Sequence, residues 1–288
     1  MGESCASNQN PIPDGPFDLF VKNALLVTMD EDFHIYHPGS VAIQGDTIAA
    51  LGPQENLAHL EARAREVLDA GGNAVMPGLV NSHTHAAMTL FRGLADDLPL
   101  EDWLNHHIFP AERRIDGEWV YWGTLLACAE MISSGTTTFC DMYLFEAEVA
   151  QAVQQAGLRA LVGEVLYDFP SPNYGPLEKG FAYTRDLIER YRADPLISVA
   201  IEPHAPLTCG PELLRRAKAL STETGAPLII HLAETWGEVE KITAQYGRSP
   251  ARHLDHLGLL DENLIAVHAV ALDGAELDRL AEKKVRVA

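Results

Sequence analysis

The sequence predicts an α/β protein, a TIM-type (β/α)8 barrel truncated after about six strands, with part of a small N-terminal β-sandwich domain. Three observations predict it. Short β-rich runs alternate with helical patterns after Pro77, a hairpin-like β pattern occupies the chain before Met76, and histidines end several of the expected parallel strands. A chain of 288 residues that is 47% hydrophobic can bury cores of this size.

The N-terminal part is expected to hold a flexible tail, residues 1–16, followed by a β domain over residues 17–76. The tail has neither the basic start nor the apolar centre of a signal peptide. Two β runs, FDLFVKNALLVTM and SVAIQGDTIAALG, follow it, and Gly45 and Asp46 mark a hairpin. A short helix is expected from Asn56 to Arg65. We interpret this part as the N-terminal portion of a small β-sandwich domain.

Residues 77–288 read as repeated strand and helix units. The predicted strands are LVNSHTH, TTTFCDMY, RALVGEVLYD, ISVAIEPHAP, PLIIHLAE and LIAVHAV, with VRVA as the start of a seventh. A complete eight-unit barrel takes about 250 residues, whereas roughly 210 are present here. A doubly wound open sheet also accommodates six parallel strands, but the placement of the histidines favours the barrel.

Charge and cysteine content restrict the partners. The formal net charge is −20, from 41 acidic and 21 basic residues, so nucleic acid and anionic membranes are excluded as partners. The four cysteines are far apart and form no CxxC pair, so neither a disulfide framework nor a thiolate zinc site is expected. We therefore expect a cytoplasmic protein with a small-molecule substrate.

His83 and His85 lie at the end of the first barrel strand, where the two-residue period of a strand points both imidazoles to one side. By itself such a pair is more often two surface histidines on a turn. However, His204, His231 and His268 each follow another apolar β run, and the active site of such a barrel lies where its strands end. Converging neutral imidazoles suit zinc or a similar divalent ion. The histidines without this setting are assigned to the surface: His34, His37, His59, His106, His253 and His256.

Glu234 follows His231 by three residues, at or just past the strand end. That position suits a general base beside a metal-activated water, since the metal lowers the pKa of water to about 7 and a carboxylate can then move its proton. A charge that stabilises the first turn of the next helix is an equally good interpretation of this residue alone.

The segment MPGLVNSHTHAAMTLFRGLADDLPLEDWLNHHIFPAE resembles the hallmark segment of methylthioadenosine/S-adenosylhomocysteine deaminases in the amidohydrolase superfamily. IEPHAPLTC and IIHLAET match further blocks, and the resemblance extends over nearly the whole chain from Phe17. It implies that His83, His85 and His231 are metal ligands and that Glu234 shuttles protons. His268 would contact the attacking hydroxide.

The same resemblance implies substrate contacts for Glu112, at the ribose hydroxyls, and for His204, near the purine. Each also has a plain structural interpretation: Glu112 as a surface acid and His204 as a packed histidine at a strand end. Apolar side chains that could wall the pocket, or equally form the core between barrel and helices, are Phe91, Leu94, Trp103 and Leu104. Because the fourth strand contains no lysine to bridge two metals, we expect one divalent ion, Zn²⁺ or else Fe²⁺.

The expected substrate is an adenine nucleoside such as 5′-methylthioadenosine, with S-adenosylhomocysteine, 5′-deoxyadenosine and adenosine as relatives. Some family members hold a substrate carboxylate with arginines where Glu164 and Pro176 stand here, which favours a neutral nucleoside. The family's aspartate ligand on the eighth strand would lie beyond Ala288, so we interpret the chain as part of a longer enzyme. We also expect a homo-oligomer.

Two alternatives remain at this point. A sister hydrolase on the same scaffold would act on a triazine, guanine or cytosine. A non-catalytic relative would serve as a binding or assembly partner. The cytidine-deaminase class is excluded, because the chain has no PCxxC motif.

Overall fold

The computed structural model describes residues 13–288. The chain divides into two compact units with the boundary between Gly78 and Leu79. The tail predicted for residues 1–16 lies mostly outside the described residues. In the part that is described, the main-chain carbonyls of Pro13 and Gly15 accept hydrogen bonds from the Arg63 guanidinium at 2.7 and 2.9 Å.

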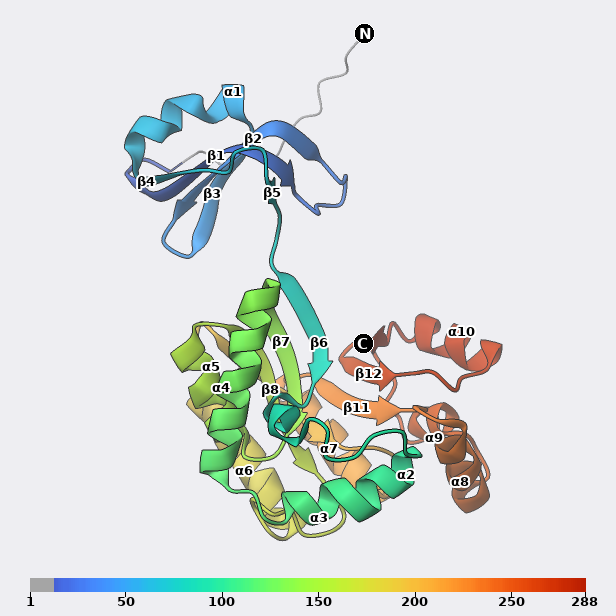
Figure 1. Ribbon diagram of the computed structural model, residues 1–288. Helices are drawn as coiled ribbons and strands as arrows, with labels where there is room; N and C mark the ends of the chain where they lie inside the picture. The colour runs from blue at the N-terminus through green and yellow to red at the C-terminus, as the bar shows by residue number, and fades with distance from the viewer. Residues whose placement is uncertain (1–12) are drawn as a thin grey trace. The chain divides into compact units, whose positions relative to one another are not determined.

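The first unit is a five-stranded sheet in the order β3-β2-β1-β4, with β5 also paired to β1 (Figure 1). Its elements are β1 (Phe17–Val27), β2 (Ile35–Gln44), β3 (Thr47–Pro53), α1 (Gln54–Leu57), η1 (Ala58–Arg63), β4 (Ala64–Asp69) and β5 (Ala74–Val75). The predicted hairpin is confirmed, since β2 and β3 pair antiparallel with Gln44 opposite Thr47. Gly45 between them has φ 60°, a left-handed conformation that glycine adopts without steric cost.

One face of this sheet is covered by the short helices. Leu57 and Leu60 from α1 and η1 pack on Phe17 and Phe20 of β1, and all four are buried. The helical stretch expected from Asn56 to Arg65 lies at Gln54–Arg63, divided into an α turn and a 3-10 turn, whereas Ala64 and Arg65 belong to β4. Burial of the two β1 phenylalanines holds this turn against the sheet.

The second unit is built on parallel strands in sequence order. They are β6 (Leu79–Thr84), β7 (Thr136–Tyr143), β8 (Arg159–Leu166), β9 (Ile197–Val199), β10 (Glu202–Pro203), β11 (Leu228–Leu232), β12 (Leu264–His268) and β13 (Arg286–Val287). Strands β6, β7 and β8 pair in chain order, and so do β11, β12 and β13. A doubly wound sheet reverses its order at a switch point, whereas these described strands show no such reversal.

The predicted fourth strand is the one that differs from expectation, because it is interrupted. Its two halves, β9 and β10, both pair with β8. Between them the main chain of Ile201 bonds to the other neighbour, donating to Pro227 at 2.9 Å and accepting from Ile229 at 3.0 Å. Pro203 has no N–H to continue the ladder. The break leaves His204 close to the site that is described below.

The helices of this unit are η2 (Ala86–Phe91), α2 (Leu100–Trp103), η3 (Leu104–Ile108), α3 (Phe109–Glu112), α4 (Gly117–Ser134), α5 (Glu146–Ala156), α6 (Leu177–Arg190), α7 (Pro211–Thr224), α8 (Trp236–Tyr246), α9 (Pro250–His256) and α10 (Gly274–Glu282). Of these, α4 packs on β7, and α5 and α6 pack on β8, whereas α2 and α3 lie beyond the end of β6 (Figure 1). Leu213, Leu214 and Ala217 of α7 are buried against Ile230 and Leu232 of β11. Strands buried on both faces explain why β11 reads as a nearly continuous apolar run.

The surface assignment of the histidines is wrong at one position. His37, His59, His106 and His256 are exposed, whereas His253 is only 2% exposed and stacks on Tyr246 with ring centroids 4.1 Å apart. Helix α9 packs back on α8, and no local pattern in the sequence signals that contact. Among the described residues, no helix combines the length and the apolar character needed to cross a membrane.

Candidate metal centre and active site

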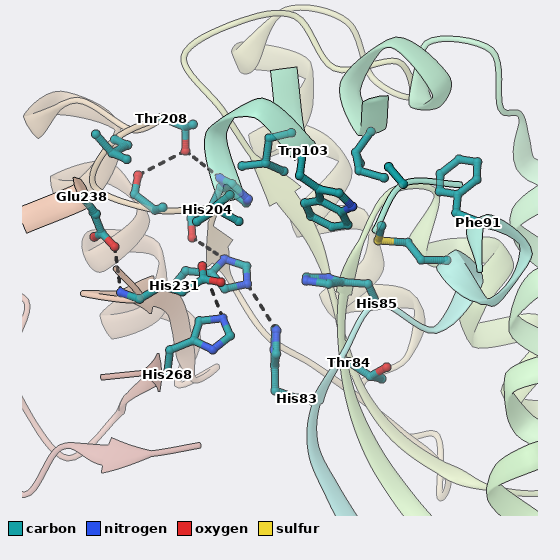
Figure 2. Close-up of a pocket in the computed structure, with 18 of the residues that line it drawn as sticks. His83, Thr84, His85, Phe91, Trp103, His204, Thr208, His231, Glu238 and His268 are labelled. Atoms are coloured by element: carbon teal, nitrogen blue, oxygen red, sulfur yellow. Dashed lines mark hydrogen bonds and ion pairs between the residues drawn. The ribbon is translucent and has the colours of Figure 1, made fainter. Parts of the chain in front are cut away.

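Three imidazoles from two distant strands meet at one point. His83 and His85 come from the end of β6, with ring centroids 4.8 Å apart, and His231 comes from β11. One ring nitrogen from each of the three lies within 4.8 Å of the others. The Nε2 atoms of His83 and His231 face each other at 3.3 Å (Figure 2). The structure thus brings together the three residues that the sequence singled out as ligands.

Main-chain carbonyls orient two of these rings. The Nδ1 of His85 bonds to the carbonyl of Met142 on β7, and the Nδ1 of His231 bonds to the carbonyl of His204 at 2.9 Å. A carbonyl only accepts, so each Nδ1 carries the proton and each Nε2 keeps its lone pair. This is how proteins fix the tautomer of a metal-binding histidine.

Burial keeps the three rings neutral. It lowers the pKa of His83 to about 3, with the neighbouring imidazoles adding to the effect. Burial also lowers the pKa of His85, and that of His231 well below its ordinary value. Neutral imidazoles with free lone pairs are suitable donors for zinc, copper, iron or nickel.

The spacing of the donor atoms also fits such an ion. Two nitrogens bound to zinc at about 2.0–2.1 Å in tetrahedral geometry lie roughly 3.3–3.4 Å apart. The Nε2 atoms of His83 and His231 are separated by 3.3 Å. The donor set therefore fits a divalent metal.

Glu234 and His268 lie beside the three histidines. The Oε2 of Glu234 is 3.6 Å from the Nε2 of His268, and both side chains are 30% exposed. The His268 ring lies parallel to that of His231 with centroids 5.3 Å apart. A carboxylate at the border of the site, partly open to solvent, can exchange protons with a bound molecule.

The strand ends that present these side chains have unusual backbone conformations. Ala233 has φ 49°, His268 has φ 73° and Ala269 has φ 51°. Non-glycine residues with positive φ cost of order 1 kcal/mol or more, and they occur mostly where the surrounding structure enforces them at functional sites. The two loops are joined because Val270 and Ala271 donate to the Ala233 carbonyl at 3.1 and 2.8 Å.

A cavity of about 700 Å³ opens above the histidines. Its lining combines the polar cluster, including His204, with apolar side chains from the segment after β6. Of the four predicted wall residues, Phe91, Trp103 and Leu104 line it, whereas Leu94 does not and is 48% exposed. The volume suits a ligand of nucleoside size.

His204 has a defined ring orientation in this cavity. Its Nδ1 is 2.8 Å from the hydroxyl oxygen of Thr208, and that hydroxyl donates to the carbonyl of Ala205 at 3.2 Å. The hydrogen bond between Nδ1 and this hydroxyl fixes the plane of the His204 ring. Burial lowers the pKa of His204 to about 3, so the ring is neutral.

The structure places Glu112 in a neighbouring cavity of about 610 Å³ rather than among the residues around the metal centre. Glu112 is 6% exposed, and burial raises its pKa to about 7. Aromatic rings of Phe109, Tyr167 and Phe169 line this second cavity, and the Tyr167 ring also approaches that of His204 at 5.1 Å. The substrate contact expected of Glu112 stays a prediction.

Sequence reasoning missed Glu238, which lines the main cavity from the first turn of α8. It is 4% exposed, and burial raises its pKa to about 7 although two main-chain N–H groups oppose the rise. The sequence did contain a signal, since Thr235 and Glu238 have the spacing of a helix-capping pair. The Thr235 side chain indeed caps α8 by accepting from the Glu238 N–H at 3.2 Å.

Comparison with known proteins identifies the family. The model of the amidohydrolase family matches residues 74–288, which include every side chain of the site. The chain belongs to the amidohydrolase family. Amidohydrolases of this kind have a TIM-barrel-like α/β fold, in agreement with the parallel strands of the second unit.

Among its relatives, the chain is 58% identical over 270 residues to the 5-methylthioadenosine/S-adenosylhomocysteine deaminase of Syntrophobacter fumaroxidans. It is 48% identical over 267 residues to deaminase 1 of the same description from Syntrophus aciditrophicus. These alignments include 94% and 92% of this chain but 61% and 60% of the relatives. The chain thus spans about three-fifths of their length. The resemblance stated from the sequence is confirmed.

Solved amidohydrolase structures are also similar. A zinc-bound adenosine deaminase from Xanthomonas campestris superposes with a TM-score of 0.90 at 40% identity, over 96% of this chain and 63% of that one. A triazine hydrolase from Arthrobacter aurescens superposes with a TM-score of 0.85 at 18% identity, over 93% of this chain and 64% of that one. At that identity the second likeness shows the fold alone.

Proposed function

We propose that this protein is a metal-dependent hydrolase that deaminates an adenine nucleoside such as 5′-methylthioadenosine and releases ammonia. The observation that carries the proposal is the meeting of three neutral imidazoles, His83, His85 and His231, beside the carboxylate of Glu234. The relatives at 58% and 48% identity, named as deaminases of methylthioadenosine and S-adenosylhomocysteine, support the substrate class.

In this proposal the three histidines hold one divalent ion through their ring nitrogens, Zn²⁺ or else Fe²⁺. The zinc in the Xanthomonas campestris structure supports the first choice. When bound, such an ion lowers the pKa of a water molecule to about 7 and so supplies the nucleophile. The fourth strand segment, ISVAIEPHAP, contains no lysine that could bridge a second ion, which supports a single-metal centre.

Glu234 is the group that moves protons. Replacing an amino group by oxygen requires one proton to travel from water to the ring nitrogen and another to the departing ammonia. Glu234 lies on the cavity wall, so its carboxylate can take up the first proton, release it to the ring and repeat the transfer for the leaving group. His268, 3.6 Å away, restrains the carboxylate and can contact the incoming oxygen.

The lining of the cavity favours a neutral substrate. Among the described residues that line it, Arg92 is the one with a permanently cationic side chain. Its guanidinium is engaged by Glu130 through two bonds of 2.9 and 2.7 Å. A ligand carboxylate therefore finds no free cation here. We propose that Trp103 and His204 contact the base and that Glu112 binds the ribose through the adjoining cavity.

The test compares Glu234→Gln with Glu240→Gln, a change at an exposed position on α8, the helix that follows Glu234. In the complete protein, Glu234→Gln should abolish ammonia release from 5′-methylthioadenosine while metal content, measured by elemental analysis, stays unchanged. Replacing His83 or His231 by Ala should instead lower the metal content. Unchanged turnover of Glu234→Gln would refute the mechanism, and preferential turnover of a triazine or guanine in the same assay would refute the substrate class.

We further propose that residues 77–288 belong to an eight-stranded barrel and that residues 17–76 belong to a small β-sandwich domain. Exposed apolar side chains on the edge strands of the second unit support the first point, namely Leu79 and Val80 on β6 and Val287 on β13. A cytoplasmic site of action is supported by three buried free thiols. Assembly as a homo-oligomer stays a prediction.

A further inference from the structure

Glu238 contacts the main chain that carries Glu234. Its Oε1 accepts from the N–H of Ala233 at 3.2 Å. Its Oε2 accepts from the N–H of Glu234 at 2.9 Å, the bond drawn from Glu238 in Figure 2. One carboxylate thus binds two consecutive N–H groups at the end of β11. Ala233 is fully buried, so these groups have little access to water as a replacement partner.

The same stretch holds the strained conformation of the site. Ala233 has φ 49°, and this left-handed turn redirects the chain after β11 so that Glu234 faces the cavity. An alanine does not favour this conformation by itself. Carboxylate bonds to both N–H groups, together with the bonds from Val270 and Ala271 to the Ala233 carbonyl, hold it in place.

Glu238 is in turn fixed by its helix. It lies in the first turn of α8, where its own N–H donates to the Thr235 side chain at 3.2 Å. In an ordinary capping box the glutamate reaches back to the N–H of the capping residue. Here it reaches one and two residues further back, to Glu234 and Ala233. The helix end is thereby connected to the residue that is proposed to shuttle protons.

We propose that Glu238 is a positioning residue, which holds the Ala233–Glu234 main chain so that the Glu234 carboxylate faces the metal centre. This inference rests on the proposed function because that function gives Glu234 its role. The contact of Glu238 with the two N–H groups does not depend on the proposed function. Glu238 need not touch the substrate to act in this way. A misplacement of a reacting group by about 1 Å costs on the order of 100-fold in rate.

The first test follows the contact and needs no turnover. In the metal-free complete protein, amide hydrogen exchange at Ala233 and Glu234 should be at least about tenfold faster in Glu238→Ala than in the parent, because the two N–H groups lose their acceptor. Glu240→Ala, which removes an exposed carboxylate from the same helix, is the matched control and should leave that exchange unchanged. Equal exchange in Glu238→Ala and the parent would overturn the proposal.

The second test separates positioning from folding. With metal content unchanged, Glu238→Ala should lower kcat about 100-fold and leave KM within about threefold, while Glu238→Gln, which keeps one acceptor oxygen, should lose about tenfold. If Glu238→Ala does not fold, the isosteric Glu238→Gln is tested in its place in both experiments.

One kinetic outcome would overturn the proposal, namely a kcat of the Glu238 variants within about threefold of the parent while Glu234→Gln is inactive. Retained turnover of Glu234→Gln would instead refute the proposed function, and the hydrogen-exchange result would still decide whether Glu238 holds the main chain.

Discussion

Replacing Gly123 by alanine should destabilise the protein through a clash between two segments of main chain. Gly123 is a buried residue of α4 that lies directly against η2, the turn after His85. An added Cβ would lie 2.5 Å from the carbonyl oxygen of Ala87 and 3.0 Å from its Cα. Thr89 also donates to the Gly123 carbonyl at 2.8 Å, so the two segments cannot separate without losing a bond.

The size of the effect follows from two opposing terms. Overpacking a rigid contact costs up to about 3 kcal/mol. Alanine in place of glycine inside a helix stabilises the helix by about 1 kcal/mol. The net loss is therefore about 2 kcal/mol, which corresponds to a Tm lower by roughly 4–8 °C for a unit of this size. Because Ala87 follows His85 by two residues, its displacement should also weaken zinc binding by about tenfold.

The assay is thermal unfolding of the purified complete protein, with zinc affinity measured by competition against a chromophoric chelator. Gly274→Ala is the control, since this helical glycine of α10 has no atom within 4 Å of the added Cβ. The control should melt at or slightly above the parent temperature. If Gly123→Ala melts at as high a temperature as Gly274→Ala, an added Cβ at the close approach of α4 and η2 does not lower the stability, and the reasoning is refuted.

Two further predictions concern buried polar groups. Burial raises the pKa of Glu164 from 4.5 to about 8, so the folded protein keeps a proton that the unfolded chain loses as pH rises above 4.5. The free energy of unfolding, and with it Tm, should therefore fall from about pH 5 to about pH 8. Glu164→Gln should reduce this fall in Tm, and a dependence of Tm on pH equal to that of the parent would contradict the prediction. Thr208→Val removes the hydrogen-bond partner of the His204 Nδ1, and it should raise KM for the nucleoside by about threefold to tenfold with metal content unchanged. A KM equal to that of the parent would show that this ring orientation does not matter for binding.

Much of the fold was predictable because its signals are local. The alternation of apolar β runs and helical patterns depends on periods of two and about 3.6 residues, which each segment carries in itself. The same holds for His83 and His85, whose spacing places both rings on one side of β6, and for the hairpin at Gly45. Parallel strands align their ends at one edge, so His231 could also be assigned to the site.

The features that the sequence did not predict depend on contacts between distant segments. His253 is buried because α9 packs on α8, and the fourth strand is interrupted because Ile201 bonds to the β11 side. Glu112 is an acid on a short helix by its sequence, and its place in a separate cavity depends on the aromatic residues after β8.

The sequence by itself determined which segments favour strands and helices, which side chains are available as metal ligands, and the net charge of −20. Tertiary structure alone decided that the Nε2 atoms of His83 and His231 lie 3.3 Å apart and that Glu238 binds the main chain of Ala233 and Glu234. The physical reason is the distance along the chain over which each property is set. Backbone periodicity is set within a few residues, whereas the tautomer, pKa and direction of a side chain depend on neighbours that only the folded chain brings near.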